Sequence, residues 1–259
     1  MSNHDINELI IKYRSTLKNN IIFNMPRKSL IYNNILWLSS YGDNCIYLID
    51  IYTQLIIKTL TFTKLKNPRG ICNYNKYIYI ACFGDPIGNI ICFDSETFVE
   101  ILNFDVPRPR GLIISGEELF ITEVMQHRIS VYNLNGVLKR YIGTGLLHCP
   151  RGIAVNNENN IVIADSGNNR IVILNPNGNL IQSSNTIYAP NDVSCYFDKI
   201  FVSQWYDKCI RIYNPITNKF GIMNKSPQIS GFFSMLYIYN HVIFVSDENG
   251  YLHIFDILF

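Results

Sequence analysis

The sequence predicts an all-β protein, a six-bladed β-propeller built from four-stranded antiparallel blades. Two observations lead to this prediction. A Pro-x-Gly corner, or a variant of one, recurs with a period of about 41 residues. Each corner is followed by short apolar runs that Asn, Gly and Asp residues separate, which is typical of strands joined by tight turns. Four short strands in a period of about 40 residues are the pattern of a propeller blade.

The corners divide the chain into six blades, which begin near residues 26, 68, 109, 150, 190 and 232. The corners are Pro26-Arg27-Lys28, Pro68-Arg69-Gly70, Pro109-Arg110-Gly111, Pro150-Arg151-Gly152, Pro190-Asn191-Asp192 and Phe232-Phe233-Ser234. The sixth corner lacks proline, and its position follows from aligning residues 234–247 with residues 152–165 without a gap. We therefore expect one domain over residues 1–259, with residues 1–24 as a closing segment.

The fourth blade shows the order of the strands most clearly. A first strand at residues 152–155 leads through a polar turn to a second strand at residues 161–164. A third strand at residues 171–175 follows, and Asn177-Gly178 marks a hairpin into a fourth strand. The second strands are apolar throughout, so we expect neighbouring blades to cover both of their faces.

The last blade needs a strand from the other end of the chain. Its third strand spans residues 251–256, and too few residues follow for a fourth. Because an open blade would expose an unpaired sheet edge, we predict that residues 10–17 supply the outer strand. The alternative is an amphipathic helix over residues 5–17, where apolar residues recur at helical spacing.

Composition narrows the class of protein. The 259 residues carry a formal net charge of +2, which excludes a globally basic nucleic-acid binder. The first residues lack the regions of a signal peptide, and no apolar run approaches the roughly 18 residues of a membrane span. The seven cysteines are scattered and form no CxxC pair, so we expect reduced thiols. We expect an intracellular, cytoplasmic monomer that does not bind membranes.

Residues 150–180 resemble the NHL repeat, whose pattern runs P-x-G-I-A-V-D, an apolar strand ending in A-D, N-x-R-I and a hairpin at x-x-G. The matching positions are Pro150, Gly152 to Val155, Ala164-Asp165, Asn168 to Ile171 and Gly178. The resemblance extends more loosely over about residues 25–259, and the GH…WD signature of WD repeats does not occur. It implies a propeller that uses one face to bind proteins or RNA.

The residue after each corner should lie at the mouth of the central channel, because first strands line the channel of a propeller. Around the ring these residues are Arg27, Arg69, Arg110, Arg151, Asn191 and Phe233. The loops between second and third strands should reach the same rim, and they carry Tyr41, Phe83, Met125, Trp205 and Tyr206. Arginine interleaved with aromatic residues suits a peptide groove or stacking on unpaired bases.

A structural role for these residues is the alternative to binding. Each second strand is followed by an acid, and an arginine paired with such a carboxylate would brace neighbouring blades. The acids are Asp43, Asp85, Glu123, Asp165, Asp207 and Asp247. The aromatic residues would then cover the ends of the blades as lids.

We expect a non-catalytic binding platform without a cofactor, whose partner is a protein segment or single-stranded RNA. The residues expected to bind are Arg27, Arg69, Arg110, Arg151, Asn191, Tyr41, Phe83, Trp205 and Tyr206.

The alternative function is that of a metal-dependent hydrolase or lactonase centred on the channel. Six-bladed lactonases, which the chain resembles, hold calcium with Glu, Asn and Asp, and Asn191 and Asp192 would be part of such a site. Arginine at four other corners argues against a cation there. A related lyase site needs converging histidines. We expect the five histidines to lie apart, at positions 4, 127, 148, 241 and 253.

Overall fold

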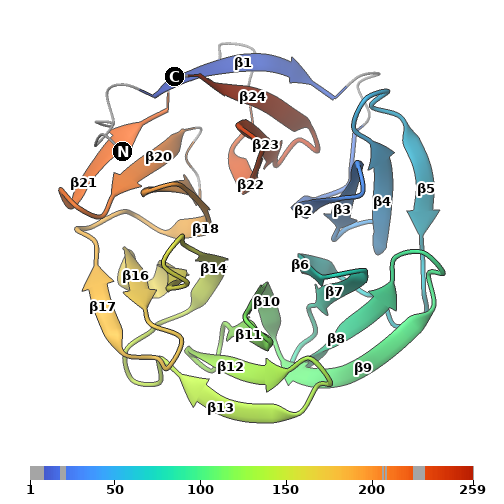
Figure 1. Ribbon diagram of the computed structural model, residues 1–259, viewed down its shortest axis with the longest axis horizontal. Helices are drawn as coiled ribbons and strands as arrows, with labels where there is room; N and C mark the ends of the chain where they lie inside the picture. Colours follow the sequence, from blue (N-terminus) through green and yellow to red (C-terminus); the bar gives the residue numbers. More distant parts are fainter. Residues whose placement is uncertain (1–8, 18–21, 206, 208, 224–230, 259) are drawn as a thin grey trace.

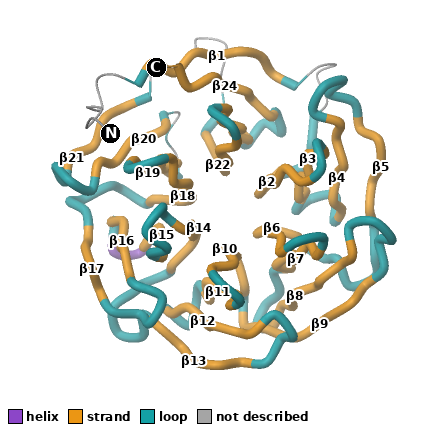
Figure 2. Tube along the Cα trace, viewed as in Figure 1, coloured by secondary structure: helices purple, strands orange, loops and turns teal. Residues whose placement is uncertain are grey.

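Six antiparallel sheets of four strands surround a central channel (Figure 1). The structure, a computed structural model, describes residues 9–17, 22–205, 207, 209–223 and 231–258. Within these ranges, strands account for nearly all of the regular structure (Figure 2), apart from one turn of 3-10 helix at Ser166–Asn168 (η3). None of the described residues belongs to a helix long and apolar enough to cross a membrane. The predicted six-bladed, all-β architecture is confirmed.

The first strand of each blade is the innermost one and lines the channel (Figure 1). These strands are β2 (Pro26–Tyr32), β6 (Pro68–Tyr74), β10 (Pro109–Ser115), β14 (Pro150–Val155), β18 (Pro190–Tyr196) and β22 (Phe233–Tyr239). Each contacts the first strand of the next blade, and β22 contacts β2 to complete the ring. The inner wall of the channel is therefore continuous around the axis.

The second strands form the core between blades. They are β3 (Ile35–Ser40), β7 (Tyr77–Cys82), β11 (Glu118–Glu123), β15 (Ile161–Asp165), β19 (Lys199–Gln204) and β23 (Val242–Asp247). Every residue of β15 is buried. Its Val162 and Ala164 pack in one apolar cluster with Val193 and Val202 of the following blade. Burial on both faces explains why these strands are apolar at consecutive positions.

The third and fourth strands pair as hairpins at the outside of the ring. The third strands are β4 (Cys45–Asp50), β8 (Ile87–Asp94), β12 (Arg128–Asn133), β16 (Arg170–Leu174), β20 (Ile210–Asn214) and β24 (Leu252–Leu258). The fourth strands within blades one to five are β5 (Ile56–Leu60), β9 (Glu100–Pro107), β13 (Leu138–Ile142), β17 (Leu180–Ser183) and β21 (Lys219–Ile222). In the fourth blade the turn uses Gly178 at φ +92°. The Asn175 side chain accepts a hydrogen bond from the Asn179 backbone N–H, at 2.9 Å.

The sixth blade is completed by β1 (Ile10–Thr16), which pairs antiparallel with β24. The first and last strands of the described chain thus lie in one sheet (Figure 1). Ile11 and Tyr13 turn inward and pack on the apolar cluster of this blade, whereas Ile10 is 60% exposed. The prediction of a closing strand is confirmed, and the alternative helix is wrong for the described residues of this segment.

The sixth corner lies one residue later than the gapless alignment predicts. Phe233, not Phe232, pairs with Asp247 as Pro150 pairs with Asp165. The turn after β22 is shorter than the one after β14, so an alignment without a gap shifts the corner. Ser234 therefore occupies the place of the corner arginines, and the assignment of Phe233 to that place is wrong.

The glycine of the Pro-x-Gly corner is required by the close approach of the next blade. A Cβ on Gly70 would lie 2.6 Å from the Arg110 carbonyl oxygen, and one on Gly111 would lie 2.5 Å from that of Arg151. Both distances are shorter than any ordinary contact, so a side chain at these positions would force the blades apart. The corner thus sets the spacing of the inner strands.

We predict that Ile11→Asp lowers the melting temperature by about 5 °C or more, because it buries a charge where β1 closes the ring. Ile10→Asp places the same charge on the exposed face of β1 and should change the melting temperature little. Differential scanning calorimetry measures both. Equal melting temperatures for the two variants would show that β1 contributes nothing to closure.

The seven cysteines form no disulfide. Desolvation raises the pKa of Cys82 and of Cys195 to about 12, so both thiols are protonated at neutral pH. We predict that Cys82 reacts with an aromatic disulfide reagent orders of magnitude more slowly than free cysteine while the protein is folded. After denaturation without reductant, seven thiols should react. A smaller number, or fast labelling of Cys82 in the folded protein, would contradict this prediction.

Candidate binding site at the channel mouth

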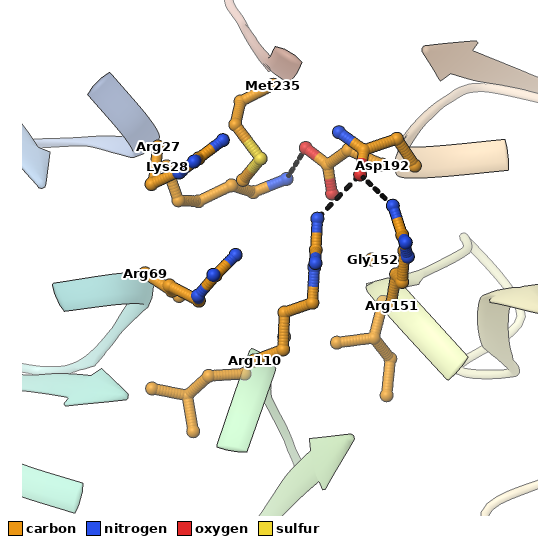
Figure 3. A pocket seen from close by; sticks show the side chains of 13 residues that line it. Arg27, Lys28, Arg69, Arg110, Arg151, Gly152, Asp192 and Met235 are labelled. Carbon is orange, nitrogen blue, oxygen red and sulfur yellow. Dashed lines mark hydrogen bonds and ion pairs between the residues drawn. The ribbon is translucent and has the colours of Figure 1, made fainter. Parts of the chain in front are cut away.

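The corner residues converge on a small pocket at the mouth of the channel (Figure 3). Arg27, Arg69, Arg110 and Arg151 come from four consecutive blades, and their side chains point toward the same central space. The other lining residues are Lys28, Gly70, Gly111, Leu112, Gly152, Ile153, Asn191, Asp192 and Met235. The cavity between these side chains is about 20 Å³, close to the space that one ordered water requires.

Asn191 holds two of the arginines in place. Its Oδ1 accepts hydrogen bonds from Arg110 at 2.6 Å and from Arg151 at 3.2 Å. Its Nδ2 donates to the Ser234 carbonyl oxygen of the next blade. Asn191 is fully buried, so this amide is a fixed part of the inner wall. Arg27, on the other side of the ring, donates to the Ser234 hydroxyl at 3.0 Å.

Asp192 is the acidic member of the lining. Its Oδ2 accepts from the Lys28 ammonium at 2.7 Å and from the Leu236 backbone N–H at 3.1 Å. Lys28 stands where other corners have glycine, and its chain reaches across the ring to this carboxylate. The pocket lining therefore carries five positive charges against one negative charge, an excess of four.

Three aromatic residues lie against the corner arginines. Tyr41, Phe83 and Trp205 occupy equivalent places, because the backbone N–H of each donates to the carbonyl of the residue before a corner proline. The distances from Cζ to ring centre are 5.3 Å for Arg27 on Tyr41, 4.6 Å for Arg69 on both Tyr41 and Phe83, 4.8 Å for Arg151 on Trp205 and 6.0 Å for Arg110 on Trp205. These are cation–π contacts, which lower the energy of partly desolvated guanidinium groups.

Burial and mutual repulsion lower the pKa of Arg27, Arg69 and Arg110. Desolvation lowers the pKa of Arg27 to about 10, and the charges of Arg69 and Arg151 add to this effect. Desolvation, followed by the charges of the other three arginines, holds the pKa of Arg110 well below its ordinary value. The guanidinium groups remain charged at neutral pH. Their proximity is therefore unfavourable in the absence of a compensating anion.

The acids that end or follow the second strands bond residues other than the corner arginines. Asp85 pairs with Arg108, just before the corner of the next blade, whereas three others pair within their own blades. Glu123 bonds Arg128 at 2.8 Å, and Asp165 bonds Arg170 at 2.8 Å. Asp247 bonds His253 in the same way, at 3.0 Å. These basic residues lie at or near the start of a third strand. The carboxylates expected as partners of the corner arginines are thus engaged elsewhere.

The predicted rim residues differ in how they relate to the pocket. The four arginines and Asn191 line it, and three aromatic residues pack on the arginines. Met125 is 50% exposed, and Val124 occupies the place equivalent to the aromatic residues. Tyr206 lies outside the described residues. The sequence did not single out Lys28, Ser234 or Met235, although their positions at corners one and six were a usable signal.

His127 and His148 lie together, so the expectation that the histidines are separate is wrong for this pair. Their ring centres are 4.6 Å apart, and their ligand atoms and that of Cys149 all lie within 4.8 Å of one another. The loop after β11 and the corner before β14 belong to consecutive blades, which brings the residues together. Two imidazoles and a thiol are ligands that Zn²⁺ accepts.

A hydrogen bond between blades explains the position of His127. Its Nδ1 accepts from the Cys149 backbone N–H at 3.0 Å, which occupies one of the lone pairs that a metal would need. Asn44 and Asn169 make the same bond in other blades, to the N–H groups of Asn67 at 2.6 Å and Ala189 at 2.8 Å. His127 therefore substitutes for a structural asparagine.

Residues 147–174 match the family model described as the NHL repeat. Among curated proteins, the Protein brain tumor of Drosophila melanogaster is 30% identical over 76 residues. That match covers 29% of this chain and 7% of the length of the relative.

Solved structures share the fold at low sequence identity. A catalytically inactive virginiamycin B lyase from Staphylococcus aureus with quinupristin has a TM-score of 0.72 and 13% identity, over 97% of this chain and all of that chain. A streptogramin B lyase has a TM-score of 0.70 and 11% identity, over 96% and 98% of the chains. A chain of a nidogen/laminin complex has a TM-score of 0.66 and 14% identity, over 83% and 92%. These likenesses show the fold alone.

We predict that Arg69→Gln leaves the free energy of unfolding unchanged or raises it slightly, because the change removes one of several repelling charges. Arg170→Gln should lower it by about 2–3 kcal/mol, because the fully buried Asp165 carboxylate would lose its cation. Urea denaturation of the two variants tests this contrast. If Arg69→Gln destabilises the protein as much as Arg170→Gln does, the corner arginines are braces between blades.

Proposed function

Because this chain is a six-bladed β-propeller of the NHL-repeat family, we propose that it is a non-catalytic platform that binds a macromolecular partner at the channel mouth. The partner is a protein segment or single-stranded RNA that presents negative charge to the corner residues. The four arginines and Asn191 make the central contacts, and Tyr41, Phe83 and Trp205 support them from the surrounding loops.

The observation that carries this proposal is the concentration of positive charge at one point of a nearly neutral protein. The net charge of the whole chain is +2, yet the lining of one small pocket has an excess of four positive charges. Such an arrangement raises the local potential and attracts anionic partners. Hydrogen bonds to Asn191 and Ser234 join the corner arginines to other blades, but neither acceptor is anionic, so bracing does not account for the excess of positive charge.

The metal-dependent alternative receives less support from the same contacts. Asn191 Oδ1 accepts from two guanidinium groups, and Asp192 Oδ2 accepts from the Lys28 ammonium. A cation at these oxygens would have to displace cations that already contact them. The charge of the pocket favours binding of an anion over binding of calcium.

We predict that the double variant Arg69→Glu, Arg110→Glu abolishes binding to ligands selected from pools of peptides and single-stranded RNA. The change reverses the charge at the centre of the platform while leaving the inner strands intact. Trp205→Ala should weaken binding roughly tenfold, because the ring supports Arg151. Fluorescence anisotropy at several salt concentrations measures both effects.

The control is Lys58→Glu, Lys139→Glu, which makes the same change of charge on the outer strands β5 and β13. It should bind as the original protein does. If both double variants lose affinity equally, the effect is one of net charge and the platform lies elsewhere. Unfolding of the rim variant without a specific loss of binding would also contradict the proposal.

A further inference from the structure

We propose that the pocket at the channel mouth is a binding site for one phosphate monoester group, carried by a phosphorylated protein segment. This inference rests on the proposed function and names the chemistry of its ligand. It depends on three features of the described residues: the convergence of the arginines, the size of the pocket, and an apolar cavity beside it.

The four arginine side chains point toward one common space and do not form an extended row along the surface. They enter from four blades, so their donors approach the central space from several directions (Figure 3). A tetrahedral phosphate group can accept from several directions at once, whereas a planar carboxylate is best matched by one or two guanidinium forks. The aromatic rings cover the faces of the guanidinium groups, and the N–H donors lie in the guanidinium plane.

Two buried donors at this site lack an acceptor. The Nε atoms of Arg27 and Arg69 have no hydrogen-bond partner among the described residues. Arg27 is only 7% exposed, so water cannot readily replace the missing acceptor. A dianionic phosphate group would supply acceptor oxygens and offset part of the excess positive charge.

The size of the pocket limits what enters it. A space of about 20 Å³ has room for about one oxygen atom, so one phosphate oxygen enters it while the rest of the group lies at the mouth, and a nucleobase or a sugar is excluded. The remainder of the ligand must therefore lie outside, on the rim. The site is suited to a terminal phosphate group presented on a side chain.

An adjoining cavity on the same rim indicates what carries the phosphate. It has a volume of about 180 Å³ and shares Arg27 with the first pocket. Its lining is largely apolar, from Met25, Pro26, Trp205, Phe232 and Phe233. Glu248 also borders it, and its carboxylate repels a second phosphate. A peptide with one phosphorylated residue and a neighbouring apolar side chain fits both cavities, whereas a nucleic acid carries a phosphate at every nucleotide.

The first experiment uses the full chain and inorganic phosphate as the probe. Phosphorus NMR line widths at constant ionic strength should show saturable binding that chloride does not abolish. Affinity for O-phosphoserine should rise between pH 5 and pH 7, as the second proton of the phosphate leaves near pH 6. Absence of saturable binding, or the same affinity at both pH values, would overturn the proposal.

Variants then localise the site. Arg69→Gln and Arg151→Gln should each weaken phosphate binding at least about tenfold, because each removes charged hydrogen-bond donors. Arg108→Gln is the matched control, since it removes the same charge from a rim arginine that pairs with Asp85 outside the pocket. Equal affinities for all three variants would overturn the assignment of the pocket.

The last experiment identifies the molecule that carries the phosphate group and uses an oriented library of phosphoserine peptides. Selected peptides should bind at least about tenfold more weakly without the phosphate, and Met25→Asp should weaken peptide binding while inorganic phosphate binds as before. A 5′-phosphorylated oligonucleotide that binds better than any selected peptide would overturn the protein segment as carrier. If phosphate binds with the expected variant pattern but no macromolecule does, the phosphate pocket stands and the platform function fails.

Discussion

The closure of six inner strands around one axis is the constraint on which the rest of this structure depends. Neighbouring strands come so close at the corners that Gly70 and Gly111 have no room for a Cβ atom. The residue before each glycine then projects toward the axis, because the other direction is occupied by the next blade. The chemistry of the channel mouth is thus determined by the second residue of each corner and, where the third is not glycine, by that side chain as well, as Lys28 and Asp192 show. In this chain the second residue is arginine in four consecutive blades.

Gathering four guanidinium groups costs stability, and several contacts offset this cost. Aromatic rings lie against the cations, and the buried Asn191 amide accepts from two of them. These contacts do not neutralise the charge, because neither an aromatic ring nor an amide is anionic. Selection for stability alone would not favour such a cluster. Sites that bind charged ligands commonly lower the stability of the fold in this way.

The fold follows from the sequence because its signals are local. Turn residues and short apolar runs repeat along the chain, and the strand at residues 10–16 follows from the need to pair β24. The sixth corner was misplaced by one residue because a shorter turn follows β22, and turn length leaves little trace in the apolar pattern. The site was only partly predictable. Arg110 and Asn191 are 81 positions apart, and no local pattern reports a contact across the ring.

The positions of a corner differ in role: some determine the spacing of the blades, and another can carry different side chains. In the Pro-x-Gly corners the glycine allows the close approach of the next blade, while the residue before it contributes little to that spacing. Arg110, Asn191 and Ser234 occupy this second corner position in blades that pack into one ring. Six such positions surround one axis, and each of them can carry a different side chain. A related propeller can therefore exchange one ligand for another through a handful of single substitutions, with its scaffold left unchanged.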